Sequence, residues 1–188
     1  MLFRSRPDSE LSRFNRHRDG RPFGLSAATI RVFLLAREVS DATGGALDVT
    51  VGPLVDAWGF GPAKRESAPT DAELESIRER VGYRKLLIDA AALTIAKAHP
   101  DIRADLSAIA KGFGVDQVAR ALDARGLQSY MVEVGGEVRV RGRNAAGIPW
   151  QVGIERPDSV EKQVRIVVPM TDRKSTRLNS SHSSVSRM

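Results

Sequence analysis

The 188-residue sequence has no cysteine, few aromatic residues and no long apolar run. Without cysteine the chain can form neither a disulfide nor a thiolate nucleophile of its own, although this does not indicate a compartment. No stretch reaches the roughly 18 apolar residues of a membrane-spanning helix, and no basic-then-apolar leader is visible. Hydrophobic residues make up 41% of the chain, which is ordinary for one globular domain.

The net charge of +6 invites comparison with nucleic-acid-binding proteins. Residues 172–188 hold four basic residues and one acidic residue, so half of the excess charge lies in this segment. Elsewhere the two signs are interspersed, as on a solvated surface. Aromatic residues, which stack on bases, make up only 5% of the chain. We therefore expect no nucleic-acid partner.

The segment 172–188 is serine-rich and shows no apolar periodicity. Such a composition cannot bury a core face, so we expect the segment to be disordered. It resembles the translated sequencing-adapter tails that end some gene models, and His182 within it is given no function. A genuine phosphorylatable tail is the alternative. The expected organisation is one partial domain over residues 1–171, followed by this tail.

Helix and strand signals alternate before the tail. Ser26 is placed to cap a helix over residues 27–43, and Thr70 with Glu73 forms a capping-box pattern before a second helix that Gly82 ends. A third helix, with Val115, Val118, Ala119 and Leu122 on its apolar face, ends at Gly126. Predicted strands cover residues 85–89, 93–97, 129–134, 137–142, 149–157 and 163–170. This order predicts an α+β domain with helices packed on a mainly antiparallel sheet.

Residues 44–62, GGALDVTVGPLVDAWGFGP, are dense in glycine and proline. Such a loop can offer backbone N–H and C=O groups to a ligand. It can equally be a packed irregular connection with Trp58 and Phe60 in the core, and the segment alone favours neither. Asp48 stands between apolar residues, so its carboxylate needs a partner.

Residues 105–114, DLSAIAKGFG, place an acid and a lysine around a loop-to-helix junction with two glycines. Glycine lets a ligand approach the backbone closely, and a helix N-terminus favours anions. The spacing is not that of a Walker motif. On spacing alone, Asp105 can also be a simple helix cap and Lys111 a solvated lysine.

Residues 132–142, VEVGGEVRVRG, put two glycines between predicted strands, which favours a bulge or a tight turn. Glu133 and Glu137 could be ligands, but nothing in the sequence pairs them with a metal. The three histidines are scattered and lack metal-ligand spacing. No nucleophile elbow is present.

Taken together and in order, these segments resemble the FAD:protein FMN transferase (ApbE) family. The resemblance runs from about Arg6 to about Pro169. The segments that carry it are RPDSELSRFN, GGALDVTVGPLVDAWGFGP, VGYRKLLID, DLSAIAKGFGVDQVA, YMVEVGGEVRVRG and PWQVGIERP.

The resemblance implies an enzyme that cleaves the pyrophosphate of FAD and transfers FMN to a Thr or Ser hydroxyl of a partner flavoprotein, such as a redox-pump subunit. AMP leaves, and Mg²⁺ is required. By motif, Ala46, Leu47 and Asp48 correspond to the FAD-contacting loop, and Asp105 and Lys111 to further FAD contacts. Ala108 stands where the family offers a main-chain carbonyl to the metal.

The sequence departs from the family pattern at both ends. Ser5 stands where the family has an aromatic residue that stacks on the flavin, and Phe3 lies two residues away. The family also continues into segments that supply the remaining Mg²⁺ ligands, and nothing like them is present. We therefore expect a truncated chain that is inactive in transfer, with a non-catalytic flavin-binding fragment as the alternative. Family members are often periplasmic lipoproteins anchored to the inner membrane, so any anchor of this chain is expected upstream.

Overall fold

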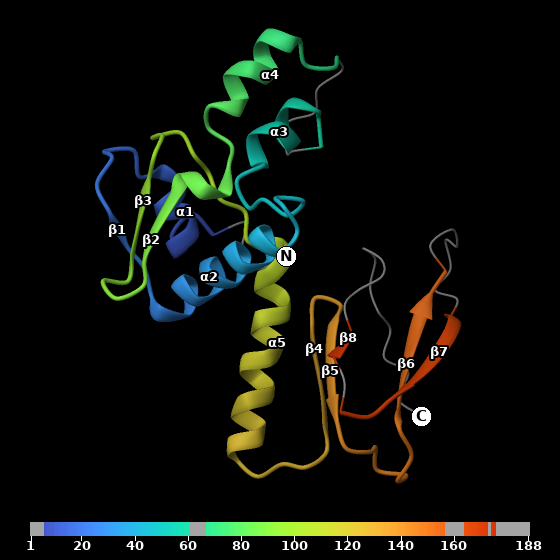
Figure 1. Cartoon of the computed structure of the whole chain (residues 1–188). Coiled ribbons are helices and arrows are strands. Elements are labelled where there is room, and N and C mark those ends of the chain that lie inside the picture. The colour runs from blue at the N-terminus through green and yellow to red at the C-terminus, as the bar shows by residue number, and fades with distance from the viewer. Residues whose placement is uncertain (1–5, 61–66, 157–163, 173, 176–188) are drawn as a thin grey trace. The chain divides into compact units, whose positions relative to one another are not determined.

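The computed structural model describes residues 6–60, 67–156, 164–172 and 174–175, and the chain divides into two compact units, residues 1–109 and 110–188 (Figure 1). Both units combine helices with antiparallel strands, so the predicted α+β class is confirmed. Within the described ranges the strands form three separate sheets, not the single sheet that we predicted. No helix in the described part of the chain is long and apolar enough to cross a membrane.

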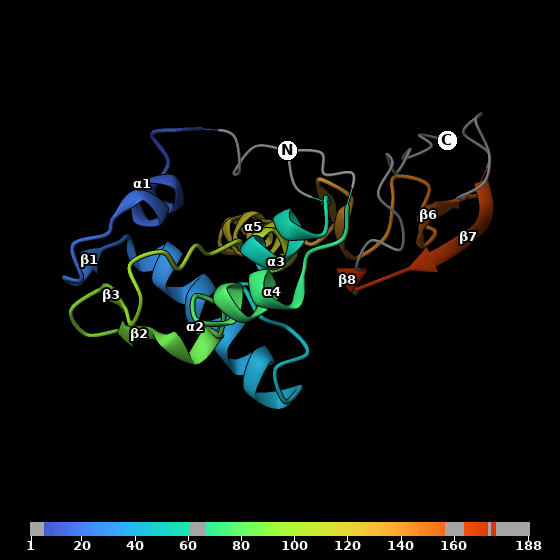
Figure 2. The same ribbon diagram turned by 90° about the horizontal axis from the view of Figure 1, so that it is seen from above.

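The first unit packs helices on a three-stranded sheet of order β1-β3-β2 (Figures 1 and 2). Both strand pairs are antiparallel, and the predicted hairpin of β2 and β3 is confirmed. The elements are α1 (Glu10–Arg16), β1 (Phe23–Gly24), α2 (Ala27–Ala42), α3 (Gly52–Ala57), α4 (Asp71–Arg78), the 3-10 turn η1 (Tyr83–Lys85), β2 (Leu86–Asp89) and β3 (Thr94–Lys97).

Three aromatic rings form part of the core of this unit. Phe14 of α1 is fully buried, and its ring meets those of Phe23 and Phe33 edge-on, with centroids 6.0 and 5.6 Å away. Ile95 of β3 and Leu86 of β2 are buried with them. These contacts anchor α1 to the rest of the unit through Phe14, its one buried residue.

The predicted helix starts in this unit are confirmed. The Ser26 hydroxyl caps α2 by accepting the Thr29 N–H, and Thr70 with Glu73 closes a complete capping box on α4. The latter helix ends at Arg78, before the predicted stop at Gly82. Sequence signals for helix starts are local side-chain bonds, which explains their accuracy here.

The glycine-rich segment contains a short helix that the sequence analysis did not predict. Helix α3 begins at Gly52, and Pro53 lies in its first turn, where a missing N–H costs nothing. Trp58 and Phe60 follow the helix with exposed fractions of 51% and 83%. The alternative that placed these two aromatic residues in the core is therefore wrong.

The second unit contains most of α5 (Ser107–Ala124), since the division falls after Ile109. Its strands form a three-stranded sheet of order β4-β5-β8 and a separate two-stranded sheet. The strands are β4 (Tyr130–Val134), β5 (Glu137–Arg141), β6 (Trp150–Glu155), β7 (Val164–Met170) and β8 (Lys174–Ser175).

Helix α5 packs on one face of the β4–β5 hairpin. Val115 and Ala119 form a buried cluster with Tyr130 and Val132. Val118, predicted on the same apolar face, is 45% exposed, so that assignment is wrong. The other face of β5 packs toward β6 and β7 through a second cluster, which contains Val138, Val140 and Met170 together with Trp150, Val152 and Val168.

The first residues of the segment that we expected to be disordered make contacts with the second unit's strands. Asp172 accepts a hydrogen bond from the Gly142 N–H at 3.0 Å, and β8 pairs with β5 through the registers Val138↔Ser175 and Arg139↔Lys174. Backbone pairing does not depend on side-chain hydrophobicity, so composition alone could not exclude it. Residues 176–188, with His182, lie outside the described residues, as do Phe3 and Ser5.

Candidate functional site

The carboxylate of Asp48 finds its partners within the first unit. Its Oδ1 accepts the Thr50 N–H at 2.7 Å and the Thr50 hydroxyl at 2.6 Å, and its Oδ2 accepts the Tyr83 N–H at 2.9 Å. Thr50 is fully buried and in turn accepts the Gly82 N–H at 2.7 Å. Asp48 therefore fixes the glycine-rich loop to the segment before β2, which is the partner that its sequence position required.

Ala46 and Leu47 precede this anchored point. Ala46 is exposed and Leu47 half-buried, and both lie between the end of α2 and Asp48. Gly44 and Gly45 lead into them with φ angles of 61° and 88°, a conformation that glycine adopts without strain. The loop can therefore present its backbone to a ligand while the Asp48 side chain holds its shape.

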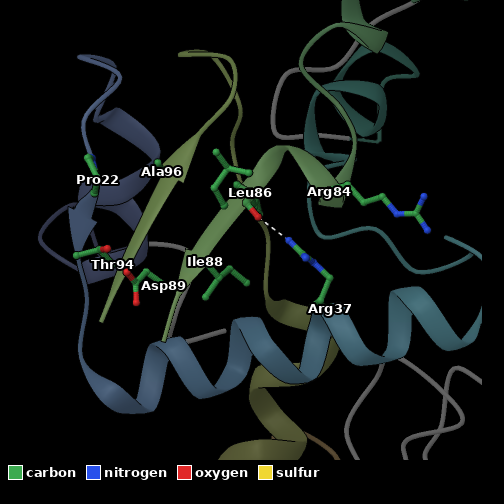
Figure 3. Close-up of a pocket in the computed structure, with 9 residues that line it drawn as sticks. Pro22, Arg37, Arg84, Leu86, Ile88, Asp89, Thr94 and Ala96 are labelled. Atoms are coloured by element: carbon green, nitrogen blue, oxygen red, sulfur yellow. Dashed lines mark hydrogen bonds between the residues drawn. The ribbon is translucent and has the colours of Figure 1, made fainter. Parts of the chain in front are cut away.

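Tyr83, whose N–H bonds to Asp48, is itself held by further contacts. The Tyr83 hydroxyl donates to Asp41 Oδ1 at 2.9 Å, and the guanidinium groups of Arg37 and Arg84 lie 5.9 and 5.4 Å from the Tyr83 ring centroid. Arg37 also donates to the Leu86 carbonyl (Figure 3). These two arginines border a hollow of about 430 Å³ along β2 and β3. It shares no lining residue with the predicted FAD contacts, so we assign it no role in that site.

Asp105 lies beside the glycine-rich loop. Its N–H donates to the Val49 carbonyl at 2.7 Å, one residue after Asp48. Its Oδ1 accepts the N–H of Ser107, the first residue of α5, at 2.9 Å. Asp105 stands two residues before the first residue of α5, so this bond is a local Asx-type turn and not the cap bond to the second or third helical residue. The structure thus brings the loop of residues 46–48 together with Asp105 at the start of the second predicted FAD-binding segment.

The sequence analysis missed a residue at this junction. The Asn15 Nδ2 donates to the Ala104 carbonyl at 2.9 Å, and the Asn15 Oδ1 accepts the Ala104 N–H at 2.8 Å. Asn15 is the last residue of the RPDSELSRFN motif. That motif was the available signal, but nothing in it indicates which backbone group the amide of Asn15 meets.

Ala108 is the exposed second residue of α5. A helical carbonyl ordinarily accepts one N–H bond from its own helix, which leaves a lone pair for a ligand. Within the described ranges, no three His, Asp or Glu side chains gather where they could hold a metal ion. Mg²⁺ prefers about six oxygen ligands, part of them water. The described residues therefore fit one metal contact and not a whole site.

Lys111 belongs to the second unit, whereas the other predicted site residues belong to the first. Its side chain lies over the turn between β4 and β5: a Cβ built on Gly135 would come within 3.0 Å of the Lys111 Cδ. Gly135 and Gly136 have φ angles of 58° and 92°, which confirms the predicted tight turn. The Oε2 of Glu137, which follows the turn, is buried and has no hydrogen-bond partner among the described residues. Gly135 therefore leaves room for the stem of Lys111.

The ApbE family model matches residues 1–181, so the chain belongs to the ApbE family. The chain is 46% identical over 168 residues to the FAD:protein FMN transferase of Vibrio cholerae serotype O1, and 33% identical over 171 residues to that of Escherichia coli K12. These matches cover 89% of this chain in both cases, and 50% and 49% of the relatives. The chain thus spans about half the length of the curated relatives it matches.

Solved structures agree with this assignment. The flavin transferase ApbE from Vibrio cholerae superposes with a TM-score of 0.77 at 44% identity, over 95% of this chain and 59% of that one. The apo form of the Pseudomonas stutzeri flavinyl transferase ApbE gives 0.74 at 34% identity, over 88% and 51%. The predicted family and fold are therefore confirmed.

Proposed function

We propose that this chain binds FAD as a member of an enzyme family that transfers FMN from FAD to a Thr or Ser hydroxyl of an acceptor flavoprotein. In this reaction the hydroxyl oxygen bonds to the phosphorus of the FMN half. The bond from that phosphorus to the AMP half breaks, AMP leaves, and the hydroxyl loses its proton. An acceptor of the redox-pump class is part of the proposal.

One observation carries the proposal. The hydrogen bond from the Asp105 N–H to the Val49 carbonyl joins the loop of residues 46–48 to the start of α5. These are two of the segments that the family resemblance assigns to FAD. The relatives that share about half of their length with this chain are named for the same substrate.

The described residues would serve binding and charge compensation. The Ala46 and Leu47 N–H groups donate to the Thr43 carbonyl and hydroxyl at 3.3 and 3.4 Å. We therefore assign the carbonyl groups of this loop to the ligand, and glycine-rich backbone suits a dinucleotide. We assign Asp105 to the polar edge of the flavin or the ribitol. The ammonium of Lys111 compensates negative charge on the pyrophosphate, whose repulsion otherwise opposes attack at phosphorus.

We propose further that transfer requires Mg²⁺, which as a Lewis acid neutralises charge on phosphate oxygens. Ala108 would supply one carbonyl ligand. Because the described residues lack an acidic cluster, we assign them the binding of FAD, and we expect this chain alone to transfer FMN poorly.

The test separates binding from transfer. The 188-residue chain is titrated with FAD and followed by flavin fluorescence anisotropy. It is then incubated with FAD, Mg²⁺ and the apo form of a redox-pump subunit, and covalent flavin on the acceptor is detected in a denaturing gel. Saturable binding is expected, and its absence would refute the proposal.

The second candidate is a flavin-binding fragment without catalytic activity, favoured by the lack of an acidic cluster among the described residues. Binding without covalent labelling supports this candidate. Labelling that a chelator abolishes supports the complete reaction, and indicates that the ion takes ligands other than Ala108 from outside the described residues.

A further inference from the structure

We propose that Asn15 is a positioning residue for the FAD site, which sets the backbone of residues 104–105 and thereby places Asp105. This inference rests on the proposed function. It gives the RPDSELSRFN motif a task that the flavin contacts do not account for, since Asn15 reaches a segment 89 residues away in the sequence.

The side-chain amide of Asn15 bonds to both backbone groups of Ala104, as a neighbouring strand does in an antiparallel sheet. The Asn15 amide donates to the carbonyl of Ala104 at 2.9 Å and accepts from the N–H of the same residue at 2.8 Å. A carboxamide carries its N–H donors and its acceptor oxygen in one plane, so a donated and an accepted bond form together. Ala104 is buried. Loss of the Asn15 bonds would leave its N–H and carbonyl without these partners, which is costly for buried polar groups.

Asp105 follows directly after this clamped residue. Its own N–H donates to the Val49 carbonyl at 2.7 Å. Three hydrogen bonds thus hold two consecutive residues, two from Asn15 and one from the glycine-rich loop. Without Asn15, only the bond to Val49 remains of these three, and the peptide between residues 104 and 105 gains freedom to rotate. The direction of the Asp105 side chain depends on that peptide.

Asn15 is itself rigidly held. The Nζ of Lys97 donates to the Asn15 carbonyl at 3.3 Å and to the His17 carbonyl at 2.9 Å, and lies 4.6 Å from the Phe14 ring centroid. At the other end of α1, the Glu10 carboxylate accepts bonds from the Ser26 N–H and hydroxyl at 3.0 and 2.7 Å. The helix is fixed at both ends, so the amide cannot follow a displaced segment.

The experiment is a double-mutant cycle on FAD affinity, measured by flavin fluorescence anisotropy on the 188-residue chain. Asn15→Ala is expected to weaken FAD binding about tenfold, the scale expected for a displaced binding group. Because Asn15 acts through Asp105, Asn15→Ala added to Asp105→Ala is expected to cause no further loss. Additive losses, or no loss in Asn15→Ala alone, would overturn the inference.

A matched control accounts for general destabilisation. Ile30→Val removes one buried methylene from α2. An apolar side chain makes no hydrogen bond, so this change lowers stability and leaves the bonds of residues 104–105 in place, and FAD affinity is expected to stay unchanged. Circular dichroism confirms that each variant is folded at the assay temperature. If Asn15→Ala does not fold, Asn15→Asp replaces it in the cycle: it keeps an acceptor for the Ala104 N–H and loses the donor.

A measurement without FAD distinguishes this inference from the proposed function. In Asn15→Ala, hydrogen exchange at the Ala104 and Asp105 amides is expected to accelerate relative to both the parent chain and Ile30→Val. Unchanged exchange would overturn the clamp itself. If the parent chain does not bind FAD, or Asp105→Ala binds it normally, the proposed function fails. The role of Asn15 in FAD binding then fails with it, even where exchange shows the clamp.

Discussion

Two charged side chains of the first unit can be compared with two ion pairs of the second by the kind of partner that holds each charge. In residues 1–109, Asp48 and Lys97 bond to backbone groups, the first to N–H groups and the second to carbonyls. In residues 110–188, Arg139 pairs with Asp116 at 2.8 Å and Arg141 with Asp123 at 2.6 Å. A charge bonded to the backbone fixes the path of the chain. A partly exposed pair of charges fixes only two side chains, and its net contribution is small.

The largest effect is expected at Asp48. Asp48→Ala removes the acceptor of the Thr50 N–H, the Thr50 hydroxyl and the Tyr83 N–H. Leaving such groups unsatisfied is expected to lower the free energy of unfolding by about 3 kcal/mol. Urea denaturation followed by circular dichroism measures this loss. A loss no larger than that of Arg139→Ala would contradict the comparison between the units.

The next effect concerns FAD affinity. Asp105→Ala and Lys111→Ala are each expected to weaken FAD binding by about 1.5–3 kcal/mol, the range for a charge-assisted contact. Glu133→Ala is the control, because Glu133 is exposed and outside the predicted FAD contacts. Flavin fluorescence anisotropy measures all three variants. Equal affinities for the control and the two site variants would show that the residues were assigned wrongly.

The fold could be predicted where the determining contacts are local. Ser26 and Thr70 cap helices through bonds to residues three positions away, and both starts were predicted. The hairpin of β2 and β3 was predicted as well. Helix α3 was not, because Gly52 and Pro53 begin it and both residues also signal loops.

The site could be predicted only in part, because its geometry depends on contacts between distant segments. Composition indicated that Asp48 needs a partner, but the partner at Tyr83 lies 35 residues away. Asn15 and Ala104 are separated by 89 residues, and no periodicity or spacing rule relates them. The family resemblance named the FAD contacts and did not indicate what holds them in place.

A smaller effect is expected from the titration of Lys97, which is 8% exposed. Burial and the nearby Arg18 lower the pKa of Lys97 to about 8 from 10.5, while Asp101 acts in the opposite direction. At a pH between about 8 and 10.5 the Lys97 amine has released its proton in the folded chain and retains it in the unfolded chain. Unfolding then takes up a proton, so stability rises with pH, by about 1 kcal/mol between pH 7 and 9.

Urea denaturation at the two pH values measures this rise, and Lys97→Met is expected to remove it. Lys85→Met is the matched control, since Lys85 lies in the same unit and its amine bonds to the exposed carbonyls of Arg78 and Glu79. If the free energy of unfolding of Lys97→Met rises equally between pH 7 and 9, another titrating group causes the effect.

The smallest effect is expected for the ion pair of Arg139 and Asp116, whose side chains are 33% and 23% exposed. Solvent screens such a pair, so a double-mutant cycle with Arg139→Ala and Asp116→Ala is expected to give a coupling of about 0.5 kcal/mol. Urea denaturation measures the coupling, and high salt is expected to reduce it further. A coupling as large as the loss from Asp48→Ala would show that paired side chains constrain the second unit as strongly as backbone-bonded charges constrain the first. The effect of each charge on stability would then depend on where the charge lies in the fold, and not on whether its partner is a backbone group or a side chain.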